Sequence, residues 1–189
     1  MKIKSLVLTI AMSLTFAGNV IAMTKAEYKT QKDQISADYK VNRDKCASLK
    51  ANAKDICVSQ AKGTEKVAKA ELEAQYEPSP RHDQRLGMAK ADAAYDTAKE
   101  KCDDLSGNAK DVCVKDAKAA YVKAKEDVKV TKASADTSKN QANKMADVKK
   151  EANDDKREAN YKAAKERCDS LAGSAKDTCQ SDAKAKFGM

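Results

Sequence analysis

The chain has 189 residues, and its 37 basic and 29 acidic side chains give a formal net charge of +8. Hydrophobic residues make up 41% of it, but alanine is the most frequent of them, Trp is absent and there are only two Phe. This composition excludes a thick apolar core and predicts thin seams between helices. Lysine alternates with acidic residues, which is typical of a solvated helix surface, so nucleic acid is not an expected partner.

The first 22 residues have the layout of a secretory signal peptide. Lys2 and Lys4 precede an apolar stretch over residues 5–17, and small residues lead to a cleavage site after Ala22. The stretch is shorter than the ~20 residues that span a bilayer. We therefore expect export to the periplasm, cleavage after Ala22, a mature charge of +6 and no membrane span in the mature chain. An uncleaved signal anchor is the alternative.

The cysteines form three pairs with one spacing: Cys46/Cys57, Cys102/Cys113 and Cys168/Cys179. An even number of cysteines in an exported chain indicates disulfide bonds. In one continuous helix the members of a pair would lie ~16 Å apart, whereas a reversal of the chain brings them to the ~5.5 Å that a disulfide prefers. We predict three bridged helical hairpins, each stabilised by roughly 3 kcal/mol. Reduced thiols in straight helices are the alternative.

Each pair brackets a near-copy of the same turn. Gly107 and Gly173 are expected to end the first helix in a left-handed conformation, and the first copy, with Ala51 at this place, is expected to be strained. The next residue is expected to cap the second helix, with an aspartate three residues later completing a box-like pair. These pairs are Asn52 with Asp55, Asn108 with Asp111, and Ser174 with Asp177.

A tyrosine stands seven residues before each leading cysteine, and a leucine stands three residues after it. At helical spacing these side chains share one face. We predict that they pack in the seam of each hairpin: Tyr39 and Leu49, Tyr95 and Leu105, Tyr161 and Leu171.

Strong helix formers dominate, and the only prolines are Pro78 and Pro80. We predict an all-α protein without a sheet, in which three disulfide-clamped hairpins form an elongated antiparallel helical or coiled-coil array. The expected units are hairpin 1 over 23–77, a proline linker over 78–81, hairpin 2 over 82–135 and hairpin 3 over 136–189. The boundary over 135–140 is soft, and one helix of ~95 Å over 108–171 is the alternative.

No catalytic constellation stands out. His82, the only histidine, lies beside the proline linker without a nucleophile near it in any motif. No Cys-x-x-Cys pair is present, and metal-binding cysteines usually lie two to four residues apart. We expect no catalytic residue, no cofactor and no metal; binding of copper(I) or zinc by paired thiols is the alternative.

The motif Tyr-x6-Cys-x2-Leu-x-Gly-Asn-Ala-Lys-Asp-x-Cys-x3-Ala-Lys, from Tyr95 to Lys118, resembles a family of small exported Ala/Lys-rich proteobacterial proteins. Such chains carry paired Cys-x10-Cys hairpins and are commonly labelled TolA-like or cell envelope biogenesis proteins. The resemblance covers the whole mature chain and implies a place in the cell envelope. The leader looks cleavable where TolA keeps a membrane anchor, and residues 182–189 leave no room for a globular C-terminal domain, so an energy-coupling role across the envelope is not expected.

The sequence therefore predicts a non-enzymatic periplasmic helical-repeat protein that acts as a scaffold, spacer or binding surface in the cell envelope. A thiol-based protein that responds to soft metals or oxidants under envelope stress is the alternative. The expected partners are an envelope protein or an anionic envelope polymer. Self-association is also possible, because thin helical seams often need a second chain.

Overall fold

The computed structural model describes residues 23–135 and 141–189, so the predicted signal peptide lies outside the described residues. Within these ranges the long helices are α1 (Lys25–Lys45), α2 (Ala51–Tyr76), α3 (Pro80–Cys102), α4 (Gly107–Ser134), α5 (Gln141–Arg167) and α6 (Gly173–Phe187). Two short 3-10 helices, η1 (Cys46–Ser48) and η2 (Cys168–Ser170), follow α1 and α5. The predicted all-α class is confirmed.

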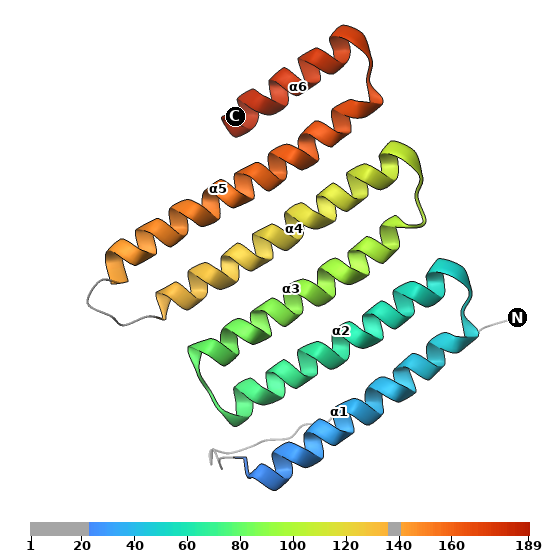
Figure 1. The fold of residues 1–189 in the computed structure, drawn as a ribbon, viewed down its shortest axis with the longest axis vertical. Coiled ribbons are helices and arrows are strands. Elements are labelled where there is room, and N and C mark those ends of the chain that lie inside the picture. Colours follow the sequence, from blue (N-terminus) through green and yellow to red (C-terminus); the bar gives the residue numbers. More distant parts are fainter. Residues whose placement is uncertain (1–22, 136–140) are drawn as a thin grey trace, which may run out of the picture.

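The helices lie side by side in one layer, in chain order and with alternating direction (Figure 1). The extensive contacts join each helix to its neighbour in the chain: α1 to α2, α2 to α3, α3 to α4, α4 to α5 and α5 to α6. The three disulfide turns lie along one edge of the layer, and the connection between α2 and α3 lies along the opposite edge (Figure 1). The predicted elongated antiparallel array is therefore confirmed.

The core is a set of thin seams, as the composition predicts. Its largest fully buried side chains are the three leading cysteines, and most of the rest are alanines. The buried apolar residues are Cys46, Ala61, Leu72, Ala89, Ala91, Cys102, Ala119, Ala152, Ala163, Cys168 and Ala183. Because burial stabilises by about 25 cal/mol per Å² of apolar area, alanine seams contribute little and covalent bridges matter more.

Two glycines allow neighbouring helices to approach closely. A Cβ atom on Gly63 in α2 would lie 2.8 Å from the Cβ of Ala93 in α3. A Cβ atom on Gly87 in α3 would lie 2.6 Å from a Val128 methyl group in α4. Both distances are shorter than real contacts between carbon atoms, so the close approach of the helices at these two positions requires a residue without a side chain.

Two helix starts carry side-chain caps. Thr24 and Glu27 form a reciprocal capping box before α1, and the amide hydrogen bond from Thr24 lowers the pKa of Glu27. Ser79 caps α3 by accepting from the amide of His82, and Pro80 is the first residue of that helix. The first helix of hairpin 2 therefore begins two residues earlier than predicted, and His82 lies in its first turn.

The second boundary between hairpins separates two helices. α4 ends at Ser134, and α5 starts at Gln141 and runs back alongside α4. This arrangement excludes one continuous helix over 108–171. The predicted soft boundary at 135–140 falls mostly on residues 136–140, which lie outside the described residues.

Candidate functional site: the disulfide turns and the contacts between hairpins

All three predicted disulfide pairs are formed. Their Cα atoms lie 5.6 Å apart for Cys46–Cys57, 5.6 Å for Cys102–Cys113 and 5.7 Å for Cys168–Cys179. In each pair the leading cysteine is fully buried, and its partner in the following helix is half-buried. Local covalent closure of each hairpin, the central prediction from the spacing, is confirmed.

The left-handed residue of each turn lies where the spacing predicts it, but it begins the second helix. Ala51, Gly107 and Gly173 have φ angles of 48°, 54° and 55° and are the first residues of α2, α4 and α6. The first helix of each hairpin ends earlier, near the leading cysteine. Because a side chain in this conformation costs about 1–2 kcal/mol, Ala51 makes the first turn the strained copy, as predicted.

The capping role predicted for the residue after each turn is wrong. The N-cap residues are Lys50, Ser106 and Ala172, and none of them makes a side-chain cap hydrogen bond. The expected caps Asn52, Asn108 and Ser174 lie one residue inside the helix, so the boxes expected with Asp55, Asp111 and Asp177 do not form.

The two asparagines instead join neighbouring hairpins. The side-chain amide of Asn52 donates to the main-chain oxygen of Glu100 at 2.8 Å, and that of Asn108 donates to Glu166 at 3.0 Å. Each acceptor lies two residues before a leading cysteine, in the last turn of α3 or α5. The third copy has Ser174 at this place, and its helix α6 is the last helix of the described residues. We call these two hydrogen bonds the asparagine contacts.

The leucines of the turns are not seam residues. Leu49, Leu105 and Leu171 are 41%, 44% and 42% exposed, so their predicted place in the seam is wrong. Their exposure is nearly the same in all three copies, although among the described residues only the first two turns have a hairpin after them. These side chains therefore contribute little to the docking of one hairpin on the next.

Exposed ion pairs cross two of the turns. Lys110 contacts Asp103 at 2.9 Å, which raises the pKa of the lysine. Lys176 contacts Asp169 at the same distance, which lowers the pKa of the aspartate. The first turn has Ala47 at the place of these aspartates. All four groups are exposed, so these pairs contribute little to stability.

Stacked tyrosines fill the seams away from the turns. The Tyr95 ring stacks on Tyr121 of the return helix with centroids 4.8 Å apart, and Tyr28 stacks on Tyr76 at 4.5 Å. The ammonium of Lys118 lies 4.9 Å from the centroid of the Tyr121 ring. For Tyr95 the predicted packing in the seam is confirmed.

A polar network around Asp92 crosses three helices. Asp92 in α3 accepts hydrogen bonds from Lys66 of α2 at 2.6 Å and from the Tyr121 hydroxyl of α4 at 2.8 Å. Burial works to raise the pKa of Asp92, but these two bonds outweigh it and the pKa is lowered. The same contact raises the pKa of Tyr121 to about 12. The network ties hairpin 1 to hairpin 2.

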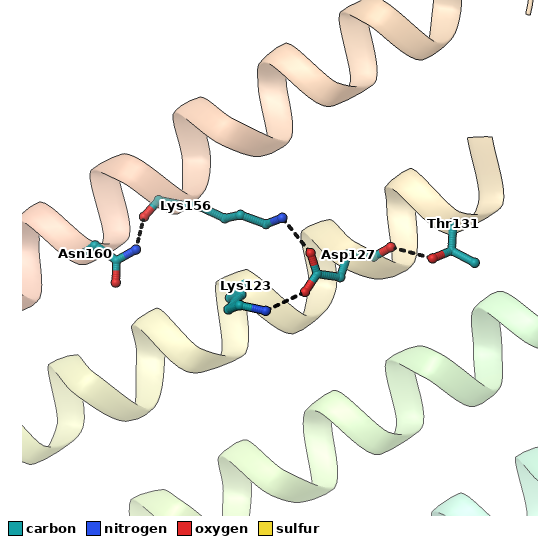
Figure 2. Close-up of polar contacts among 5 residues, drawn as sticks. All are labelled: Lys123, Asp127, Thr131, Lys156 and Asn160. Atoms are coloured by element: carbon teal, nitrogen blue, oxygen red, sulfur yellow. Dashed lines mark hydrogen bonds and ion pairs between the residues drawn. The ribbon is translucent and has the colours of Figure 1, made fainter. Parts of the chain in front are cut away.

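Hairpins 2 and 3 are joined by charged side chains (Figure 2). Asp127 of α4 accepts from Lys123 of its own helix at 2.9 Å and from Lys156 of α5 at 2.5 Å. The bond from Lys156 is the largest cause that lowers the pKa of Asp127. Nearer the turn, Arg167 pairs with Asp116 across the same seam.

Glu126 places a carboxylate inside this seam. It is 3% exposed, its Oε1 contacts Lys129 at 2.8 Å, and its Oε2 has no hydrogen-bond partner. The Lys129 ammonium also lies 3.5 Å from Glu151 and 3.8 Å from Asp155 of α5. The hydrogen bond to Glu126 is the largest cause that raises the pKa of Lys129. The Lys129 ammonium thus forms ion pairs with three carboxylates.

The asparagine contacts were missed from the sequence because asparagine is also a common N-cap residue. A signal was nevertheless present. Asparagine occurs in the two copies that have a following hairpin, and serine occurs in the last copy. A role within one hairpin would not explain this difference between the copies.

No family model matches this chain, and neither does any curated protein or solved structure. No helix of the described residues is both long and apolar enough to cross a bilayer. Among these residues, no group of three or more His, Cys, Asp and Glu side chains is arranged to hold a metal ion.

Proposed function

We propose that this chain is a non-enzymatic helical-repeat protein of the periplasm that acts as a scaffold, spacer or binding surface in the cell envelope. The observation that carries the proposal is the single layer of helices, in which each helix packs on its neighbours and no other described segment covers the two broad faces. A protein built this way has much surface for its size, as repeat proteins that bind along an extended face do.

The contours of one face support binding. A groove of about 590 Å³ runs between α2 and α3, and a groove of about 290 Å³ runs between α1 and α2. Thr64 and Ala68 line both grooves, so the two lie side by side with a low ridge between them. Small side chains on the ridge would let an elongated partner lie across it.

The proposed compartment rests on covalent chemistry. Disulfides persist in oxidising compartments such as the periplasm, and the first 22 residues have the layout of an export signal. The thiol-based alternative needs free cysteines, and all cysteines of the chain are paired. The scaffold proposal is therefore the better supported of the two.

The proposal is tested by site-specific photo-cross-linking in intact cells that export the full chain. A photoreactive residue at Thr64, on the ridge, is expected to form a defined adduct with an envelope protein or polymer. The same residue at Thr30, which is exposed but lines neither groove, is the matched control and is expected to form none. Equal labelling from both positions, or a turnover activity that one side-chain substitution abolishes, would remove the proposal.

A further inference from the structure

Only the middle disulfide turn takes part in both contacts between hairpins. Its Glu100 carbonyl accepts from Asn52, and its Asn108 donates to Glu166. The first turn only donates. The last turn only accepts, since it has Ser174 at the place of the asparagine. The shape of the middle turn therefore affects the docking of all three hairpins.

We propose that the Cys102–Cys113 disulfide is a redox-sensitive lock on the docking of the array. In the oxidised protein it holds an acceptor and a donor at positions that serve hairpins 1 and 3 together. Its reduction loosens the docking of both hairpin 1 and hairpin 3 on hairpin 2. Loss of either outer disulfide affects one docking contact. This conformational device depends on the fold alone and holds whatever partner the array binds.

The geometry ties the bond directly to the two contacts. Glu100 lies two residues before Cys102, and Asn108 lies five residues before Cys113, so the disulfide links the end of α3 to the start of α4. Apart from it, the two helix ends are joined by residues 103–106, which form no regular helix. The ion pair across this turn is exposed and is a weak substitute for a covalent bond.

A dithiol reductant can open the bond in two balanced steps. A thiolate of the reductant attacks the Sγ atom of the half-buried Cys113, forms a mixed disulfide and releases Cys102 as a thiolate, which takes up a proton. The second thiolate attacks the mixed disulfide and releases Cys113, which is protonated in turn. Two electrons and two protons pass to the protein, and the reductant ends as a disulfide. The Cys102 sulfur lies 3.2 Å from the Ala98 carbonyl oxygen, so the new thiol has an acceptor in place.

The test measures two distances by pulsed electron spin resonance. Spin labels are attached through keto amino acids at the exposed positions Lys62 in α2, Lys90 in α3 and Lys149 in α5, so that no new cysteine is added. The 62–90 pair reports docking of hairpins 1 and 2, and the 90–149 pair reports docking of hairpins 2 and 3. The variant C102S/C113S is expected to lose the narrow distance peak in both pairs.

The outer disulfides provide matched controls. C46S/C57S is expected to lose the narrow peak only for the 62–90 pair, and C168S/C179S only for the 90–149 pair. In a chain that keeps only the middle disulfide, adding a dithiol reductant should broaden both distributions further, and reoxidation should reverse this. If the middle variant broadens no more pairs than an outer variant, the proposal is overturned.

Unfolding of a variant would give the same broadening for another reason, so circular dichroism and a second variant are needed. N52A/N108A keeps every disulfide and removes both asparagine contacts. It is expected to broaden the distance peak measurably in both pairs while its helix content stays unchanged. If this variant keeps both peaks narrow, the middle disulfide does not act through these contacts and the proposal is wrong.

Discussion

The asparagine contacts make a quantitative prediction for Asn52→Ala. The substitution removes a 2.8 Å hydrogen bond from a half-buried amide to the Glu100 carbonyl, 48 residues away. The carbonyl keeps a second donor, because the amide of Asp103 lies 3.1 Å from it. The acceptor is therefore not left unsatisfied, and the loss is that of one neutral hydrogen bond, about 1 kcal/mol.

Part of this loss in the free energy of unfolding is offset, because alanine is a better helix former than asparagine. We expect a net fall of about 0.5–1 kcal/mol in the free energy of unfolding, which lowers Tm by about 2 °C for a chain of this length. Asn108→Ala is expected to behave in the same way. Since the two sites lie on different seams, the double variant should lose about the sum of the two effects.

The assay is thermal and urea unfolding followed by circular dichroism, together with amide hydrogen exchange at the ends of α3 and α5. Ser174→Ala is the matched control, because it changes the equivalent residue of the third copy, after which the described residues hold no further hairpin. It should leave Tm unchanged and raise exchange at neither helix end. If Ser174→Ala destabilises as much as Asn52→Ala, the long-range role of the asparagines is refuted.

Three further predictions test the seams. Gly87→Ala is expected to lower the free energy of unfolding by about 1 kcal/mol, because overpacking at Val128 outweighs the gain in helix propensity. In urea unfolding, the double variant Gly87→Ala/Val128→Ala should be more stable than the sum of the two single effects predicts. Leu105→Ser should change Tm little because the side chain is exposed; a loss typical of a core leucine would restore the seam assignment. The lowered pKa of Asp127 means that its contribution is fully present above the ordinary aspartate pKa and is lost as pH falls through the lowered value. Lys156→Met should make the loss of stability below about pH 4 smaller, by less than about 1 kcal/mol because the ion pair is half exposed. If the free energy of unfolding of the variant depends on pH as that of the wild type does, this prediction is contradicted.

The architecture could be predicted because it is encoded locally. Cys102 and Cys113 are close in sequence, and Gly107 between them provides the left-handed residue of the reversal. Few breakers and many helix formers predict long helices without knowledge of the partner helices. Three copies of one local pattern then fix three hairpins.

Contacts between hairpins could not be predicted in the same way, because they depend on residues that are distant in sequence. The spacing of Asn108 and Asp111 fits a capping box, and nothing local reveals that Glu166 lies opposite the asparagine. Likewise, the need for glycine at Gly63 follows from Ala93, which lies on another helix. The approach of the two helices has to be known before either role can be inferred.

Leu105 was misplaced for a different reason. Its spacing from Cys102 places it on the seam face only if the helix continues, but α3 ends at Cys102. Leu105 lies three residues beyond the end of α3, where helical periodicity no longer determines the direction of a side chain. Helix ends set by a covalent bond thus fall outside what a periodic pattern can predict.

Because each helix of the described residues makes its extensive contacts with the helices before and after it in the chain, damage to the array stays near the place where it occurs. Loss of α6 would strip one side of α5 and leave the first two hairpins with all their mutual contacts. Such a molecule should be digested stepwise from its ends, and the two helices of each hairpin released would still be cross-linked at their turn by its own disulfide.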